Sequence, residues 1–231
     1  MTVVNLSFAA CGFMGIYHLG TVEALLRHGD RLLASLRACA GASAGALAAS
    51  VVVTAPDKLE HCKEFTYMFA SNVRRQTLGA LTPRYDFMLE LRDGIEDILP
   101  ADAHLLANER LHISITNSKT GKNNIVSSFT SRDELIKKWI DGGFTDSLPI
   151  LPVGRTITVS PFSGSQDICP RHSGHRKLHL RLANMTVICS RDNIKRLNQA
   201  LFPPPLPRMQ AVHQEGYEDA LRFLRTEGWT Q

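Results

Sequence analysis

The segment Gly41-Ala42-Ser43-Ala44-Gly45 constrains the fold of this 231-residue chain more than any other. It has the Gly-x-Ser-x-Gly form of a nucleophile elbow, in which a serine occupies a tight turn between a strand and a helix. Residues 36–40 before it are compatible with a short strand, and the apolar residues 46–53 after it are compatible with a buried helix. The segment therefore predicts a strand–turn–helix unit with Ser43 as the nucleophile, and an inert serine in a glycine-rich turn is the alternative.

The composition predicts a single globular domain with at most a small appendage, since 44% of the residues are hydrophobic. A net charge of +4 is too small to indicate nucleic-acid binding. Five cysteines without a Cys-x-x-Cys pair argue against a disulfide framework and against a zinc site. Residues 1–5 lack the basic start of a secretory signal, and no apolar run approaches the roughly 20 residues of a spanning helix. We therefore expect a cytoplasmic protein whose membrane contact is peripheral.

Strands and helices alternate along the sequence, which indicates an α/β fold with parallel neighbouring strands. We expect residues 161–174, which are rich in Ser, Gly, Pro and His, to form a loop, and the stretch Asp167–Arg181 to be exposed. The expected strands are 3–9, 36–40, 111–116, 125–129 and 155–159, and the expected helices are 16–28, 46–53, 58–78, 87–99, 132–140, 191–201 and 217–228.

Three glycine-containing loops carry the candidate chemistry: Cys11–Gly15, Gly41–Gly45 and Asp141–Gly143. In an open parallel sheet such loops gather at the carboxyl ends of the strands, where ligands bind. Ser43 is then the candidate nucleophile and Asp141 the candidate base. The backbone N–H groups of the first loop, which leads into a helix, are candidate donors to an oxyanion.

Two other interpretations are weaker. The first loop lacks the first glycine of a dinucleotide-binding motif, since Ala10 stands in its place, and no acidic residue follows at the required distance. A histidine base is formally compatible with the order of the chain but poorly placed, because the candidates lie in a basic polar stretch or in the C-terminal helix. These candidates are His172, His175, His179 and His213, with His18 on the first helix better explained by packing.

Basic residues on the predicted helix 191–201 offer a further alternative. Arg191, Lys195 and Arg196 are better explained as a solvated face than as a contact with a lipid surface. Cys11 lies in the first loop but has no evident histidine partner in the sequence.

Taken together, the three loops resemble those of the patatin-like phospholipase family. The stretch Asn5–Phe13 is similar to its adipose triglyceride lipase branch. Three further segments, Pro83–Met88, Leu111–Asn117 and Leu148–Pro152, are similar to the shortest member of that branch. The resemblance covers nearly the whole chain.

The resemblance implies a three-layer α/β/α sandwich with a mostly parallel central sheet, and a Ser–Asp dyad that works without histidine. It makes residues 1–160 the catalytic domain and residues 161–231 a loop and C-terminal helical extension packed on it. It implies hydrolysis of acylglycerols, phospholipids and retinyl esters at a membrane or lipid-droplet surface, with acyl transfer as a side reaction and with no metal or organic cofactor. The implied site comprises Ser43 and Asp141 as the dyad, Gly12, Phe13, Met14 and Gly15 as the oxyanion hole, Gly41 and Gly45 in the elbow, and Gly142 and Gly143 beside the base.

The chain departs from the family pattern ahead of Asp141. In the family a small-residue segment, a proline loop and a strand precede the Asp-Gly-Gly loop, whereas here residues 135–138 run directly into Trp139-Ile140-Asp141. We therefore expect the sheet to lack one strand and the chain to be impaired in stability or activity. A catalytically impaired lipid-surface binding protein of the same fold is the alternative function.

Overall fold

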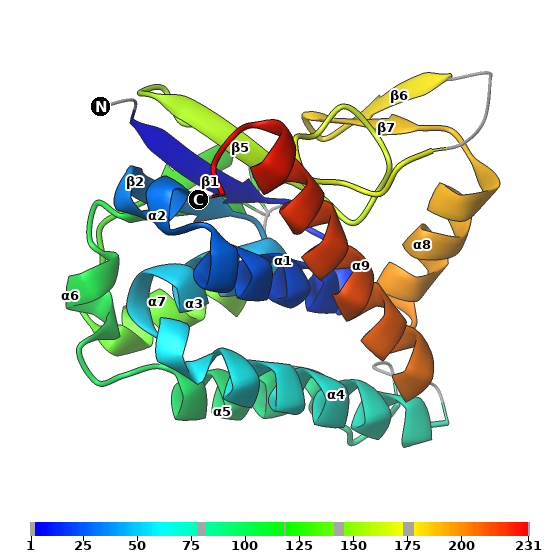
Figure 1. Ribbon diagram of the computed structural model, residues 1–231. Coiled ribbons are helices and arrows are strands. Elements are labelled where there is room, and N and C mark those ends of the chain that lie inside the picture. Colours follow the sequence, from blue (N-terminus) through cyan, green and yellow to red (C-terminus); the bar gives the residue numbers. More distant parts are fainter. Residues whose placement is uncertain (1–2, 78–81, 118, 141–145, 173–177, 231) are drawn as a thin grey trace.

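A mostly parallel sheet forms the centre of the fold (Figure 1). The computed structural model describes residues 3–77, 82–117, 119–140, 146–172 and 178–230. Within these residues the sheet has five strands in the order β4-β3-β2-β1-β5, of which only β4 runs antiparallel to its neighbour. The strands are β1 Val4–Phe8, β2 Leu36–Gly41, β3 Leu111–Thr116, β4 Asn123–Val126 and β5 Arg155–Val159. The predicted α/β class with a mostly parallel central sheet is confirmed.

The interior strand β1 is buried along its whole length, with apolar Val4, Leu6 and Phe8 alternating with polar Asn5 and Ser7. Phe8 belongs to the main core and its ring packs against His18 of the first helix. The opposite face of β1 is covered by an irregular segment, where the Asn5 side chain donates a hydrogen bond of 2.7 Å to the Val153 carbonyl. Because side chains alternate along a strand, β1 separates the helical core from this covering segment.

Helices pack beneath the sheet in two tiers, α1 and α3 next to it and α4 and α5 below them (Figure 1). The helix α3 contacts β1, β2 and β3, and α4 contacts α1 and α5. The helices are α1 Gly15–His28, α2 Asp30–Ala34, α3 Ala44–Thr54, α4 Leu59–Arg75, α5 Phe87–Ile98, α6 Ala103–Ala107, α7 Arg132–Ile140, α8 Arg191–Leu201 and α9 Leu206–Thr226, with short 3₁₀ turns at Gly12–Met14 and Pro56–Lys58.

The C-terminal helix α9 crosses α1 at close range (Figure 1). An added Cβ at Gly216 would lie 2.1 Å from the Tyr17 carbonyl oxygen, and one at Gly20 would lie 1.9 Å from the carbonyl oxygen of His213. At the same crossing the Tyr17 hydroxyl donates a hydrogen bond of 2.7 Å to Asp219. The two glycines therefore let the helix backbones touch, and α9 is fixed on the N-terminal part of the chain.

The prediction for the region after β5 was partly wrong. Residues 161–172 contain no helix or strand, but Ile168 is fully buried and exchanges backbone hydrogen bonds with Thr158 and Ser160. The expected exposed loop Asp167–Arg181 therefore begins as a packed segment. Its last residues belong to β6 His179–Leu182, which forms a hairpin with β7 Met185–Ile188. The hairpin turns at Ala183 and Asn184, which both have positive φ. His and Arg on one side of β6 concealed the strand, since composition alone resembles a loop.

Two element boundaries also differed from the prediction. Helix α9 begins at Leu206, eleven positions before the expected start, because Pro207 lies in its first turn, where a missing N–H breaks no helical hydrogen bond. The strand β4 covers Asn123–Val126 instead of 125–129, since the Asn117 side chain accepts hydrogen bonds from the amides of Lys119 and Thr120 and closes the turn early.

None of the described helices is both long and apolar enough to cross a membrane.

Candidate active site

Ser43 occupies a strained position between β2 and α3. Its backbone has φ 52° and ψ −126°, a left-handed combination that costs a non-glycine residue about 1–3 kcal/mol. Such strain persists only where the surrounding structure enforces it, and it is concentrated at functional sites. The Ser43 side chain is exposed and makes no capping hydrogen bond to α3. The turn therefore presents the hydroxyl to the cavity side of the elbow, and no described residue is a hydrogen-bond partner of it.

The two elbow glycines are required by close backbone contacts. An added Cβ at Gly41 would lie 2.4 Å from the carbonyl carbon of Gly45, and one at Gly45 would lie 2.1 Å from the carbonyl oxygen of Phe8. The first contact joins β2 to the start of α3, and the second joins α3 to the end of β1. Side chains at these positions would push the helix away from the sheet, so the glycines fix the position of Ser43.

The glycine-rich loop after β1 lies next to Ser43. An added Cβ at Gly15 would lie 3.1 Å from the Ala44 Cβ, so the first loop and the elbow are in contact. The amides of Met14 and Gly15 donate to the carbonyls of Cys11 and Gly12. The amides of Gly12 and Phe13 begin the 3₁₀ turn and donate to no other residue in the described part of the chain. Of the four predicted oxyanion-hole residues, these two have an N–H group available.

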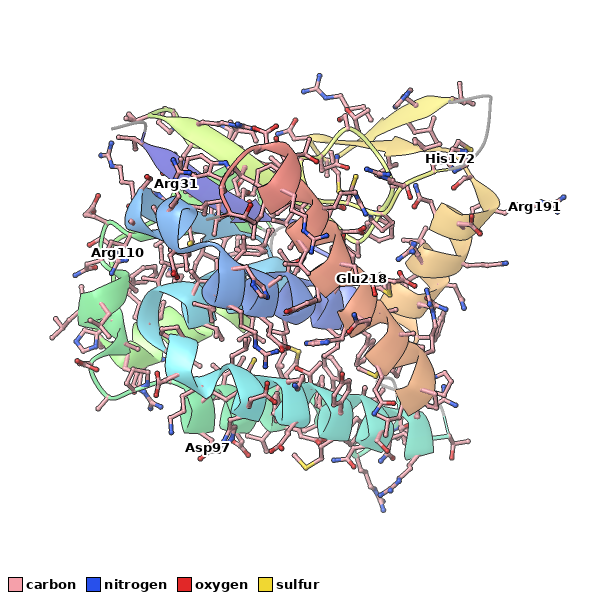
Figure 2. All side chains as sticks on the ribbon, in the orientation of Figure 1. Arg31, Asp97, Arg110, His172, Arg191 and Glu218 are labelled. Atoms are coloured by element: carbon pink, nitrogen blue, oxygen red, sulfur yellow. The ribbon has the colours of Figure 1, made fainter. Side chains whose placement is uncertain are left out.

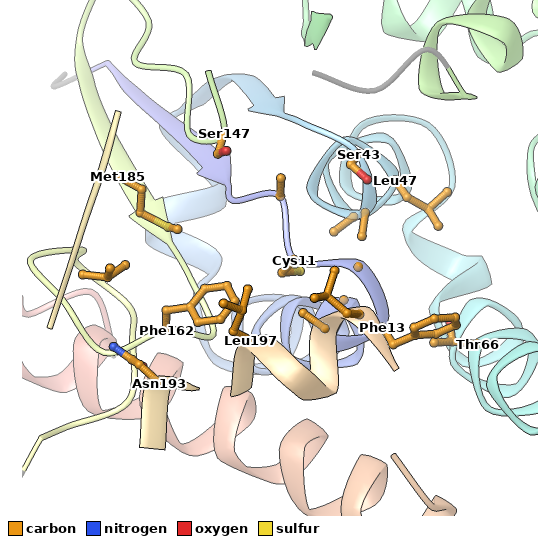
Figure 3. A pocket seen from close by; sticks show the side chains of 18 of the residues that line it. Cys11, Phe13, Ser43, Leu47, Thr66, Ser147, Phe162, Met185, Asn193 and Leu197 are labelled. Carbon is orange, nitrogen blue, oxygen red and sulfur yellow. The ribbon is translucent and has the colours of Figure 1, made fainter. Parts of the chain in front are cut away.

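A cavity of about 720 Å³ extends from Ser43 between the helices and the β6–β7 hairpin (Figure 3). Its lining is mostly apolar and includes Ser43, Cys11 and Phe13. An apolar cavity of this size with a few polar groups is typical of a site for a small apolar ligand or an acyl chain. The walls come from α4, α5, β7 and α8, represented by Phe65, Phe69, Phe87, Leu91, Val187 and Leu197.

These wall residues were not predicted from the sequence. Phe13, Phe69 and Phe87 come from three different elements, yet their ring centroids lie 4.9–6.1 Å apart. Phe69 and Phe87 were signalled only by the apolar residues of their predicted helices, and Phe13 was expected only as part of the oxyanion hole. Neither signal says which residues pack against each other. The joint wall exists only in the folded chain.

Asn193 connects α8 to the cavity wall. Its side-chain amide donates to the carbonyls of Ser163 (2.8 Å) and Ile188 (2.7 Å), and its carbonyl oxygen accepts from the Ser163 amide (2.9 Å). The residue is buried, and its side chain borders the cavity (Figure 3). These bonds hold the first turn of α8 against the segment that follows β5.

The other candidate nucleophile and bases are poorly placed. Burial raises the pKa of the Cys11 thiol well above its usual value, so the thiol stays protonated and unreactive. No histidine lies among the described residues that line the cavity. His213 is on α9, 3.2 Å from the Glu23 carboxylate, and His179 is on β6. His175 lies outside the described residues.

The predicted base Asp141 and its neighbours Gly142 and Gly143 also lie outside the described residues. Helix α7 runs to Ile140, so the described chain immediately before Asp141 is a helix and contains no strand. On the far side, Ser147 lines the cavity and its carbonyl accepts a hydrogen bond of 2.9 Å from the Ala10 amide. The segment that follows the Asp-Gly-Gly motif therefore returns to the glycine-rich loop. Among the described residues, no three His, Cys, Asp or Glu side chains gather closely enough to hold a metal ion.

Comparison with known proteins shows the family of this chain. A sequence profile described as patatin-like phospholipase matches residues 6–123, which include the glycine-rich loop and the elbow. The chain is 52% identical to patatin-like phospholipase domain-containing protein 4 of Homo sapiens, over 99% of both chains. This chain belongs to the patatin-like phospholipase family. The family and the relative expected from the sequence are both confirmed.

Other patatin-like relatives are longer. Patatin-like phospholipase domain-containing protein 2 of Homo sapiens is 37% identical over 97% of this chain, and 1-acylglycerol-3-phosphate O-acyltransferase PNPLA3 of Homo sapiens is 33% identical over 97%. The chain spans about half the length of these two relatives. The names of the relatives place lipases and acyltransferases in the same family.

The alignment with the 52% identical relative also reveals a deficit in length. It runs over 251 positions, although this chain has 231 residues. At least 20 aligned positions of the patatin-like relative therefore have no counterpart here. A deficit in length agrees with the expectation that a segment is missing from this chain by comparison with the family pattern.

Proposed function

We propose that this chain has the site of a serine lipid acyl hydrolase, with Ser43 as nucleophile and Asp141 as base. The observation that carries the proposal is the strained, exposed Ser43 in the lining of an apolar cavity. A patatin-like hydrolase acting on acylglycerols, phospholipids or retinyl esters needs such a cavity for an acyl chain. We place its action at the surface of a membrane or a lipid droplet.

The proposed reaction uses these groups in turn. The Ser43 hydroxyl oxygen attacks the ester carbonyl carbon while its proton passes to Asp141, and the carbonyl oxygen becomes an oxyanion. The free amides of Gly12 and Phe13 are the donors proposed for this oxyanion, each worth roughly 10²–10³ in rate. Asp141 returns the proton to the leaving alcohol, which leaves an acyl-enzyme. Water then releases the fatty acid, or a second alcohol accepts the acyl group.

Covalent labelling tests the nucleophile. A fluorophosphonate probe should form one adduct, on Ser43, and Ser43→Ala should abolish it. Ser147→Ala is the matched control, because Ser147 lines the same cavity on ordinary backbone and should leave the adduct intact. An adduct on Ser147, or one that survives Ser43→Ala, would refute the assignment of the nucleophile.

A catalytically impaired lipid-surface binding protein is the second candidate, and the deficit of at least 20 positions favours it. A base held about 1 Å from its required position can cost about 10²-fold in rate, and loss of general-base catalysis costs roughly 10²–10⁴. In this case Ser43 keeps its geometry while Asp141 lacks the strand that should fix it. Folded protein that forms no adduct would favour this second candidate.

A chimera separates the two candidates. Inserting the relative's additional residues between Lys138 and Trp139 should raise ester turnover by at least ten-fold if the deficit misplaces the base. Asp141→Ala should then reduce turnover strongly in the chimera and little in the shorter chain. Robust turnover by the shorter chain that is lost in Asp141→Ala would show that the dyad is intact without the segment.

A further inference from the structure

The helix α8 carries an apolar face that is exposed to solvent. Ile194, Leu197 and Leu201 recur at helical spacing, and Ile194 and Leu201 are both 64% exposed. Phe202, directly after the helix, is also exposed. Four large apolar side chains gathered on one exposed element form a patch of the kind that marks an interaction surface.

The same face forms part of the cavity that contains Ser43. Ile194, Leu197 and Leu201 all line this cavity while remaining exposed, so the cavity opens along α8 (Figure 3). Across the opening, Leu180 of β6 and Met88 of α5 are also both exposed and part of the lining. The cavity mouth is therefore framed by apolar side chains from three separate elements.

Two cations flank this apolar face. Successive residues of a helix turn by 100°, which places Arg191 about 60° and Lys195 about 100° around the helix from Ile194, both on the same side of the Ile194–Leu201 face. Arg191 projects outward from α8 (Figure 2). Neither residue forms an ion pair with another residue in the described ranges, whereas Arg196 is bound to Glu215 at 2.7 Å. Exposed cations beside an apolar stripe are the pattern of helices that lie in the interface of anionic membranes.

We propose that the exposed face of α8 is the surface by which this chain docks on a lipid surface that carries anionic headgroups. A protein partner or a second copy seated here would cover the cavity mouth, whereas a lipid surface leaves the mouth facing its substrate. The proposal rests on the proposed function for the meaning of the cavity. The docking proposal goes beyond the proposed function because it names the helix that docks and the charge of the lipid headgroups.

Docking at α8 also brings lipid close to the glycine-rich loop. An added Cβ at Gly12 would lie 2.2 Å from the carbonyl oxygen of Ala200, so the last turn of α8 rests directly on that loop. Helix α8 alone would therefore separate the docked lipid surface from the proposed oxyanion donors. No further element of the described chain intervenes between them.

Vesicle binding tests the docking surface, and it is measured in the Ser43→Ala background so that hydrolysis plays no part. Flotation with neutral phosphatidylcholine vesicles and with vesicles containing phosphatidylserine should show tighter binding to the anionic set. Ile194→Glu should weaken binding at least ten-fold, because a carboxylate replaces an inserted apolar side chain. The matched control is Leu105→Glu on α6, since Leu105 is also 64% exposed and lies at the opposite end of the molecule (Figure 1).

The charge contribution has its own variant. Lys195→Gln should weaken binding to the anionic vesicles roughly five-fold and leave binding to neutral vesicles unchanged. Unfolding temperatures of all variants should match the parent, because the substituted side chains are exposed.

Three results would overturn the proposal: parent-like binding by Ile194→Glu, an equal loss in Leu105→Glu, or a dimer that Ile194→Glu dissociates without any vesicle binding by the parent. Failure of fluorophosphonate labelling would refute the proposed hydrolase instead and leave the docking surface standing.

Discussion

Acidification should destabilise this protein through His18, a residue of α1 that is fully buried beside the glycine-rich loop. Its Nε2 lies 2.8 Å from the Ala9 carbonyl oxygen, which can only accept, so Nε2 carries the proton and Nδ1 carries a lone pair. Nδ1 has no hydrogen-bond partner in the described chain, and the Phe8 and Tyr17 rings pack at the imidazole. Protonation would therefore create an unpaired cation in an apolar site.

The magnitude follows from the difference between the folded and unfolded pKa values. Burial lowers the pKa of His18 from 6.5 to about 4 in the folded chain. Between these values the unfolded state binds more protons than the folded state, so the free energy of unfolding falls as the pH falls. The contribution of neutral His18 to the free energy of unfolding is present above the unfolded pKa and is lost as the pH falls. Between pH 7.5 and pH 5, His18 alone should lower the free energy of unfolding by about 2 kcal/mol.

The assay compares urea unfolding of the parent with His18→Gln at several pH values. Glutamine keeps an N–H donor for the Ala9 carbonyl but does not titrate in this range. The parent should lose about 2 kcal/mol more than the variant between pH 7.5 and pH 5, with the other titrating groups common to both. Parallel pH profiles would refute the reasoning and show that His18 is not held neutral.

Three further substitutions test the contacts that position the site. Gly12→Ala places a Cβ 2.2 Å from the backbone of α8 at a residue whose φ is +52°. The substitution should lower the free energy of unfolding by about 1–3 kcal/mol and slow fluorophosphonate labelling. An unchanged labelling rate would contradict the contact. Asn193→Ala removes three buried hydrogen bonds and should cost about 3 kcal/mol in denaturant unfolding, whereas Asn198→Ala on the exposed side of α8 should cost less than about 0.5 kcal/mol. Gly216→Ala should separate α9 from α1 and lower the melting temperature, at a cost of about 1–3 kcal/mol; a parent-like melting curve would show that this crossing is not tightly packed.

Much of the fold could be predicted because its signals are local. The strand β1, the elbow at Gly41–Gly45 and the periodic helix α5 each lie within one stretch of sequence, and each forms where it was expected. The family was also recognisable, since its motifs are short, ordered and rich in glycine. Ser43 was predicted as an exposed nucleophile position, and its left-handed backbone and its place in the cavity support that proposal.

The main error came from composition. The hairpin β6–β7 was predicted as a loop because the stretch Asp167–Arg181 is rich in His and Arg, although His179–Leu182 alternates polar and apolar residues. The sequence also could not show that Ile194, Leu197 and Leu201 of α8 border the cavity, because Ser43 and the walls from α4 and α5 lie about 100 residues or more away along the chain. The interpretation of Arg191 and Lys195 as a solvated face stays a prediction.

The sequence by itself therefore determined the family, the parallel α/β arrangement and the turn that presents Ser43. These properties follow from backbone requirements at a few glycines and from apolar periodicity, both of which act over a few residues. Only the tertiary structure decided that α8 rests on Gly12, that four separate elements enclose one apolar cavity, and that the mouth of this cavity is exposed. Those properties depend on which surfaces meet when the chain folds, and a local pattern specifies only that a residue is apolar, not the surface against which it packs.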